Sequence, residues 1–169
     1  MKSIIQTGFG SPGEVLTVGE AGDPVVDDDG VLIRVRAASI HIGDVYGIRG
    51  FPKVMRPIFK SMRPKSGVVG TDLAGVVESV GESVKRLRSG DEVFGSCKGA
   101  FAEYTSATED KLALKPDNLT LEQASAIGVS AFTALQALRD HGDLREGQKV
   151  LIVGGSGGVG TFAVQIAEA

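Results

Sequence analysis

The stretch that decides the fold is KVLIVGGSGGVGTFAVQIA, residues 149–167. It begins with a short apolar run, 149–153, which leads into a glycine-rich turn and then into an amphipathic segment. Gly155, Gly157 and Gly160 fit G-x-G-x-x-G, a pattern typical of dinucleotide binding when a strand precedes it and a helix follows. The first glycine allows a sharp turn, the second lets a pyrophosphate approach the backbone, and the third allows close helix–strand packing. The sequence therefore predicts a strand over 149–153, a phosphate-binding loop and a helix.

The helix after this loop would offer free N–H groups and a positive dipole end to phosphates. We assign dinucleotide binding to six loop residues: Gly155, Ser156, Gly157, Gly158, Val159 and Gly160. A triphosphate loop, G-x-x-x-x-G-K-[ST], would need Lys at position 161, where Thr161 stands. A doubly wound fold also needs further strands and an acidic ribose-binding residue about 20 residues past the glycines. We therefore expect this chain to be the incomplete front part of a larger protein.

Composition narrows the class of protein. The chain has 169 residues, of which 42% are hydrophobic, enough for a packed core, and a net charge of −3. The acidic balance argues against nucleic acid and against electrostatic membrane binding. One cysteine, Cys97, excludes a disulfide framework and a multi-cysteine zinc site. No apolar stretch is long enough for a secretory signal or a membrane span, so we expect a cytoplasmic protein.

Short strands separated by glycine turns fill the first part of the chain, which is typical of a small barrel or sandwich. The expected strands are 3–6, 14–18, 31–38, 73–80, 90–95, 101–107 and 111–115. The pattern changes after Pro116, where Thr120 and Gln123 form a capping box that predicts a helix to about Ile127. A second helix is expected over 131–140, ended by Gly142. We place a domain boundary near Leu119, giving domains 1–119 and 120–169.

Two polar segments lie between the strands of the first part. Residues 39–50 hold a cluster: Ser39, His41, Asp44, Tyr46 and Arg49. Residues 51–65 carry five basic side chains and no acid, and Pro52, Pro57 and Pro64 argue there against a regular helix. We expect a mobile surface loop over 51–65, with a basic lid near an anionic ligand, or a partner patch, as the alternatives.

Taken in order, the motifs resemble the medium-chain dehydrogenases/reductases, specifically the zinc-independent quinone oxidoreductase-like branch. The matching stretches are 31–40, 70–81, 90–95, 99–104, 126–134 and 154–160. The resemblance implies a mixed α and β fold: a chaperonin-10-like (GroES-like) catalytic β-barrel domain, then the first βα unit of a Rossmann domain. It further implies an alcohol dehydrogenase-like oxidoreductase that transfers hydride from NADP(H), or NAD(H), to a quinone, enone or similar carbonyl, as a homodimer when full length.

The positions of the catalytic zinc ligands decide the branch. Zinc-dependent members of the superfamily usually place Cys, His and Cys where this chain has His41, Thr71 and Val129. One imidazole cannot hold a catalytic zinc, which needs three protein ligands. The structural zinc lobe is also missing, because Cys97 leads almost directly to Gly99. We therefore expect no metal.

The resemblance also supplies candidate site residues. Tyr46 matches a tyrosine of the substrate cleft, which orients a carbonyl or helps to deliver a proton, with interdomain packing as the alternative. His41 stands where the branch usually has Asn, either as a catalytic or cofactor contact or as a hydrogen-bonded histidine at a strand end. Thr133 matches a threonine beside the nicotinamide. Asp44 matches an acidic residue that is more often structural.

A second hypothesis is that this chain is a truncated, inactive barrel module that acts in binding or dimerisation. Its last strand and helix would expose apolar side chains with nothing to cover them, namely Leu151, Val153, Phe162, Val164 and Ile166.

Overall fold

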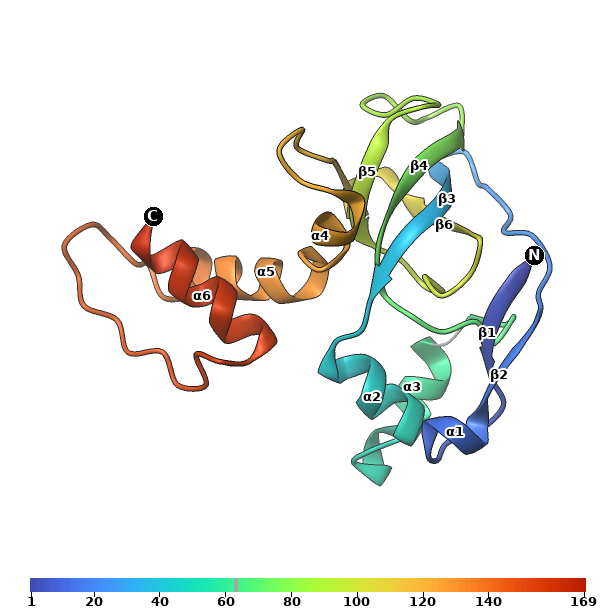
Figure 1. The fold of residues 1–169 in the computed structure, drawn as a ribbon, viewed down its shortest axis with the longest axis horizontal. Coiled ribbons are helices and arrows are strands. Elements are labelled where there is room, and N and C mark those ends of the chain that lie inside the picture. The colour runs from blue at the N-terminus through green and yellow to red at the C-terminus, as the bar shows by residue number, and fades with distance from the viewer. Residues whose placement is uncertain (63) are drawn as a thin grey trace.

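A computed structural model describes residues 1–62 and 64–169. In Figure 1 a strand-rich part stands beside two helices, α5 and α6, that lie against each other. Five strands form an antiparallel sheet in the order β6-β3-β4-β5-β7. Their bounds are β3 Gly30–Ser39, β4 Asp72–Val80, β5 Glu92–Ser96, β6 Tyr104–Thr108 and β7 Leu112–Leu114.

The five-stranded sheet curls into a barrel. Its two edge strands, β6 and β7, follow each other in the chain with only the 3-10 turn η2 (Glu109–Lys111) between them. Three residues span at most about 11 Å, so the two edges of the sheet must lie close together. The core inside it is made of fully buried side chains: Val31, Ile33, Leu73, Val77 and Val93. The predicted alternation holds at Val31 and Ile33, while bulges at Leu32/Ile33 and Val35/Ala37 interrupt it further along β3.

The N-terminal hairpin corrects one predicted strand. β1 (Lys2–Gln6) pairs with β2 (Leu16–Glu20), so the second strand begins two residues later than expected. The preceding residues form a helical turn, α1 (Pro12–Val15), which starts at a proline. Proline suits that position because its missing N–H would have no partner in the first turn.

The prediction of an irregular loop over 51–65 is wrong. α2 (Ile42–Arg49) is followed by the 3-10 turn η1 (Lys53–Met55) and the helix α3 (Arg56–Met62). Pro57 is the second residue of α3, where no intrahelical N–H bond is lost, and Pro64 comes after the helix ends. Arg63 lies outside the described residues.

The helices after the barrel begin as the capping box predicts. Thr120 Oγ1 accepts from the Gln123 N–H at 3.2 Å, and Gln123 Oε1 accepts from the Thr120 N–H at 2.9 Å. α4 (Leu121–Ser125) packs on the barrel through Ala124. α5 (Gly128–Leu135) begins three residues before the predicted start and continues as a π-helical turn, η3 (Gln136–His141), which ends at Gly142. The domain boundary near Leu119 stays a prediction.

The predicted strand over 149–153 is not formed. A strand needs a neighbouring strand for its backbone hydrogen bonds, and no strand pairs with these residues in the part of the chain that is described. The side chains of Leu151 and Val153 are 87% and 89% exposed. The predicted helix is present as α6 (Gly158–Glu168), and it packs on α5 with Phe162 and Ile166 half-buried. Among the described residues, none of the helices has both the length and the apolar character needed to span a membrane.

Candidate functional site

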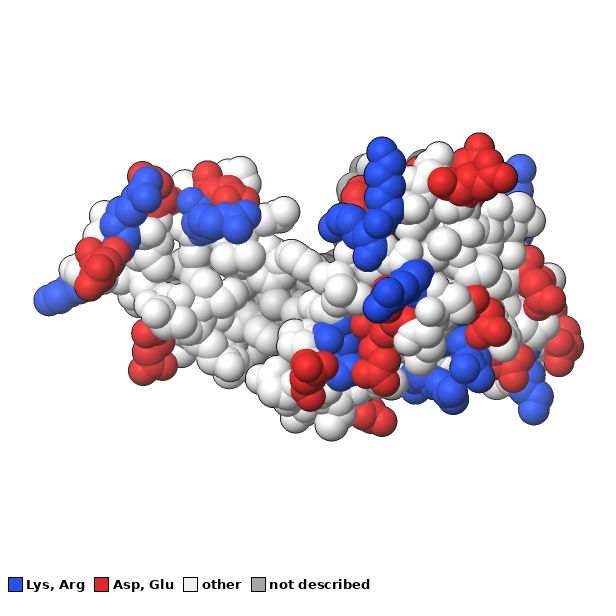
Figure 2. Space-filling model, turned by 90° about the horizontal axis from the view of Figure 1, so that it is seen from above, with Lys and Arg blue, Asp and Glu red and all other residues white. Residues whose placement is uncertain are grey.

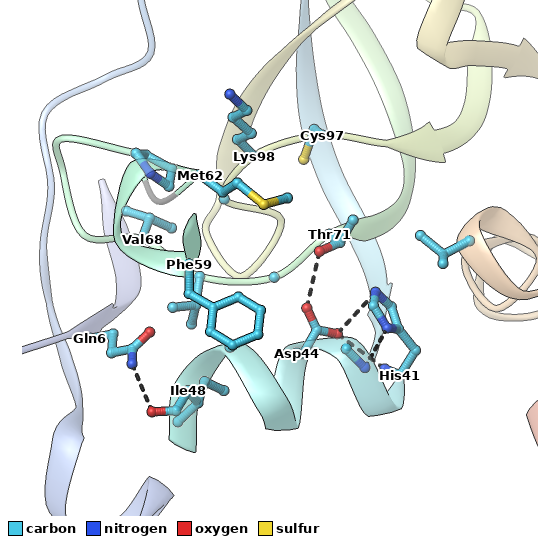
Figure 3. A pocket seen from close by; sticks show the side chains of 17 residues that line it. Gln6, His41, Asp44, Ile48, Phe59, Met62, Val68, Thr71, Cys97 and Lys98 are labelled. Carbon is cyan, nitrogen blue, oxygen red and sulfur yellow. Dashed lines mark hydrogen bonds and ion pairs between the residues drawn. The ribbon is translucent and has the colours of Figure 1, made fainter. Parts of the chain in front are cut away.

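A pocket of about 380 Å³ opens between α2, α3 and two loops of the barrel (Figure 3). Its lining is mostly apolar, with a few polar groups, as is usual for small-molecule sites. The three positions that hold zinc in other members of the superfamily, His41, Thr71 and Val129, all lie in this lining. Segments far apart in the sequence therefore converge on one pocket.

His41 lies two residues after the end of β3 and caps α2. Its Nδ1 accepts from the Gly43 N–H at 2.9 Å, and its own backbone N–H donates to Asp44 Oδ2 at 3.0 Å. Because Nδ1 accepts a hydrogen bond, the neutral imidazole carries its proton on Nε2. Nε2 is buried without a hydrogen-bond partner and lies 3.6 Å from Asp44 Oδ2, too far for a hydrogen bond. His41 is thus a hydrogen-bonded cap whose Nε2 is buried beside Asp44 without a hydrogen bond.

Asp44 joins α2 to the loop before β4. Its Oδ1 accepts from Thr71 Oγ1 at 3.0 Å while its Oδ2 accepts from the His41 N–H, and the residue is only 8% exposed. A buried carboxylate with these partners holds neighbouring segments in place. This arrangement favours the structural interpretation of Asp44.

The side chains around the pocket include few groups that could ligate a metal ion. Of the three zinc-ligand positions only His41 carries a ligating group. Burial raises the pKa of the Cys97 thiol to about 12, despite the Thr105 hydroxyl that donates to its sulfur at 3.3 Å, so the thiol stays protonated at neutral pH. Across residues 1–62 and 64–169, no three His, Cys, Asp or Glu side chains are grouped so as to hold a metal ion. Independence from metal stays a prediction.

Two predicted site residues are not brought into the pocket. Tyr46 is 42% exposed, and its ring lies 6.0 Å from that of Phe51, outside the pocket lining. Thr133 is exposed on α5, where its hydroxyl donates to the Val129 carbonyl at 2.6 Å. The roles of Tyr46 and Thr133 stay predictions.

The glycine loop lies at the N-terminus of α6, the end of that helix nearer the barrel in Figure 1. A Cβ at Gly160 would stand 2.1 Å from the Gly154 carbonyl oxygen, so only glycine allows this approach of loop and helix. The close contact is with the loop itself, not with a strand as predicted. Positive φ occurs at Gly154 (80°), one residue before the expected turn position at Gly155.

The loop and the pocket are joined through the first turn of α5. A Cβ at Gly158 would lie 3.2 Å from Ser130 Oγ, so the loop lies against the residue that follows Val129 of the pocket lining. The face in Figure 2 carries its charged side chains mainly on the two lobes, and few lie between them. The first turn of α5 therefore lies against the glycine loop at Ser130 and contributes Val129 to the pocket lining.

Sequence reasoning missed Asp72, which connects the barrel to α5. Asp72 is 1% exposed, and its Oδ1 accepts from the Val129 N–H at 3.0 Å. Burial raises the pKa of this carboxyl, and the Val129 N–H opposes the shift. A Cβ at Gly128 would lie 2.4 Å from Asp72 Oδ1. The available signal was a carboxylate at the start of an apolar strand, because such a group needs a partner when buried.

Comparison with known proteins identifies the class. Residues 27–117 match the family "Alcohol dehydrogenase GroES-like domain", and the chain belongs to that family. The chain is a medium-chain dehydrogenase/reductase of the quinone oxidoreductase-like branch, which confirms the predicted resemblance and the barrel type.

The individual relatives agree with this assignment. The chain is 37% identical to the quinone oxidoreductase of Sus scrofa over 171 residues, covering 100% of this chain and 50% of that protein. It is similar to a solved quinone oxidoreductase from Coxiella burnetii, with a TM-score of 0.87, 33% identity and coverage of 99% and 53%. Escherichia coli quinone oxidoreductase complexed with NADPH gives a TM-score of 0.83 and 27% identity, with coverage of 99% and 49%. The chain spans about half the length of the curated relatives it matches.

Proposed function

We propose that the protein containing this chain transfers hydride from NADPH to a quinone, enone or similar conjugated carbonyl without a metal ion. The observation that carries the proposal is the pocket in which His41, Thr71 and Val129 converge, joined through α5 to the glycine loop. Conjugated acceptors suit such a pocket because their own π-system spreads the developing negative charge, so that no Lewis acid is required. The names of the relatives support the same class of acceptor.

The glycine loop fits a dinucleotide phosphate. α6 has 11 residues, and the first N–H groups of a helix have no intrahelical partner. Gly157, the N-cap, presents no side chain to an approaching pyrophosphate. The relative solved with NADPH supports a nicotinamide cofactor, for which we propose NADP(H). When bound, the reduced nicotinamide supplies the hydride.

The chain's own residues orient the acceptor. The Nε2–H of His41 has no hydrogen-bond partner among the described residues but is buried beside Asp44 Oδ2, so a carbonyl oxygen of the acceptor would accept from it once the imidazole turns toward the cavity. Negative charge develops on that oxygen as hydride arrives, so the hydrogen bond strengthens in the transition state. The apolar side chains of Ile48, Phe59 and Val69 exclude water from the acceptor.

The test uses the open reading frame that contains this chain, expressed to its stop codon. NADPH oxidation with benzoquinone is followed by absorbance for the unmodified protein, His41→Ala and His41→Gln. Loss of one positioned donor costs about a hundredfold in kcat. We expect that loss for His41→Ala and partial recovery for His41→Gln, whose amide N–H is a donor. Activity unchanged in His41→Ala would remove His41 from the proposed role, and an inactive unmodified protein would refute the function.

A second candidate is binding or dimerisation by the chain itself, which the exposure of Leu151 and Val153 favours. Sedimentation of the 169-residue chain decides this case. A dimer that Leu151→Asp and Val153→Asp dissociate would support the module hypothesis. A cytoplasmic location and a full-length homodimer are also proposals, to be tested by cell fractionation and by sedimentation of the expressed reading frame.

A further inference from the structure

The pocket lining includes one charged side chain that no described residue contacts through a hydrogen bond or an ion pair. Asp44 is held by Thr71 and the His41 backbone, and the Cys97 thiol by Thr105. Lys98, which is exposed, forms neither a hydrogen bond nor an ion pair with any described residue. Within the pocket lining that the structure describes, Lys98 is therefore a cation available to a ligand.

Lys98 lies across the pocket from the proposed reaction centre. In Figure 3 the imidazole of His41 is on one side, Thr71 lies between, and Met62 and Lys98 are on the other side. Val129, which connects the pocket to the glycine loop, belongs with His41 and Thr71 among the zinc-ligand positions of the superfamily. An acceptor whose carbonyl accepts from His41 would extend past Met62 toward Lys98, whose side chain points outward from the pocket in Figure 3.

The helix α3, which contributes to the pocket, belongs to a basic segment of an otherwise acidic chain. The net charge of the chain is −3, yet residues 51–65 contain no Asp or Glu. α3 supplies Phe59 and Met62 to the pocket, and its exposed Lys60 lies outside the pocket lining. A positive potential at one side of a pocket attracts ligands with a negative group.

We propose that the acceptor carries an anionic group, of the carboxylate or phosphate class, on the side opposite its conjugated carbonyl, and that Lys98 is a specificity-determining residue. The inference rests on the proposed function and adds the substrate class. The carbonyl accepts from His41, the apolar middle of the acceptor packs on Phe59 and Met62, and the anion pairs with Lys98. Long basic side chains commonly combine apolar contact along the stem with a charged end in water.

The probe is β-benzoylacrylate, an enone that carries a carboxylate, compared with its neutral methyl ester. The expressed reading frame is assayed with NADPH, and kcat/KM is measured for both probes. The acid-to-ester ratio of each variant is divided by that of the unmodified protein, which cancels the different intrinsic reactivities of the two probes. Lys98→Ala, Lys98→Glu and Lys98→Arg are compared with Lys111→Ala, whose exposed lysine lies in η2 outside the pocket lining.

We expect Lys98→Ala to lower the acid-to-ester ratio by about two- to fivefold, the usual size for an exposed ion pair. Lys98→Glu should lower it further, Lys98→Arg should preserve it, and Lys111→Ala should leave it unchanged. Raising NaCl from about 0.05 M to about 0.5 M should lower the ratio in the unmodified protein, because salt screens the pair. A ratio that neither Lys98→Ala nor Lys98→Glu changes would overturn the proposal.

Binding to the chain itself separates this proposal from the proposed function. Amide NMR shifts of the 169-residue chain are titrated with each probe. Tighter binding of the acid, lost in Lys98→Glu, supports the anionic subsite even if no NADPH is oxidised. Reduction of the ester and the acid with the same salt-independent ratio in all variants would leave the oxidoreductase function standing and refute the anionic subsite.

Discussion

The barrel and the segment 143–157 contain similar apolar runs, yet only the barrel turns them into strands. Val31 and Ile33 are fully buried because β3 lies between β4 and β6. Residues 149–153 have the same β-branched and aliphatic character, and they form no strand. A strand is thus a property of pairing as much as of sequence, and β-propensity acts only where a neighbour exists. The same type of apolar side chain should therefore contribute more to the free energy of unfolding in the barrel than in residues 149–153.

The largest difference is expected from one substitution made in both regions. Leu73 is fully buried in the barrel, whereas Leu151 is 87% exposed. Leu73→Ala should lower the free energy of unfolding by about 2–5 kcal/mol, through lost transfer energy and a cavity. Leu151→Ala should change it by less than about 0.5 kcal/mol. Urea unfolding of both variants measures this, and similar losses would mean that residues 149–153 are packed.

An intermediate effect is expected at the glycine loop. A Cβ at Gly160 would meet the Gly154 carbonyl at 2.1 Å, whereas one at Gly157 would be 3.4 Å from the same atom. Gly160→Ala should displace the loop from α6 and cost about 1–3 kcal/mol of local stability, seen as faster amide exchange in α6.

Gly157→Ala is the matched control. It should leave the exchange of α6 unchanged while weakening NADPH binding by the expressed reading frame, because its methyl group would stand where the pyrophosphate approaches. An unchanged NADPH affinity in Gly157→Ala would show that the glycine loop does not contact the bound cofactor.

An effect of similar size is expected at the junction of the two regions. Asp72→Ala removes the acceptor for the Val129 N–H and should cost about 1–3 kcal/mol. Asp72→Asn keeps an acceptor oxygen and should be less damaging. A large and equal loss in both variants would show that the charge, and not the hydrogen bond, holds α5 to the barrel.

The pH dependence of stability gives a second test at Asp72. Burial raises the pKa of the Asp72 carboxyl in the folded chain above its ordinary 3.8. Between pH 3.8 and the folded pKa, the folded chain therefore binds more protons than the unfolded one. The contribution of Asp72 to stability is therefore full below pH 3.8 and declines as pH rises through the folded pKa. Asp72→Asn should remove this decline from a series of urea unfolding curves, and an unaltered pH profile would contradict the shifted pKa.

Sequence reasoning predicted most of the barrel because its strands carry local signals: alternation at Val31 and Ile33 and glycine turns between strands. The capping box at Thr120 likewise predicted α4, since its bonds are local. The predictions were wrong where the structure depends on strand pairing or on the exact position of a proline in a helix. The run 149–153 lacks a partner, and the prolines of 51–65 sit at positions that a helix tolerates.

The candidate site was less predictable than the fold. The convergence of His41, Thr71 and Val129 came from resemblance to the family, not from spacing. Three-dimensional contacts were needed to see that Nδ1 of His41 accepts a hydrogen bond and that its Nε2 is buried beside Asp44 without one. Asp72 offered only the signal of a carboxylate at the start of an apolar strand, and Lys98 offered none. The partner of Asp72 and the absence of a partner for Lys98 depend on segments that are distant in the sequence.

The central claim is that hydride transfer in this pocket needs no metal. The direct measurement is the rate of NADPH-dependent benzoquinone reduction by the expressed reading frame before and after treatment with a chelator, together with the metal content of the sample. The account predicts an unchanged rate and no stoichiometric zinc. A rate abolished by chelation and restored by added zinc would contradict it.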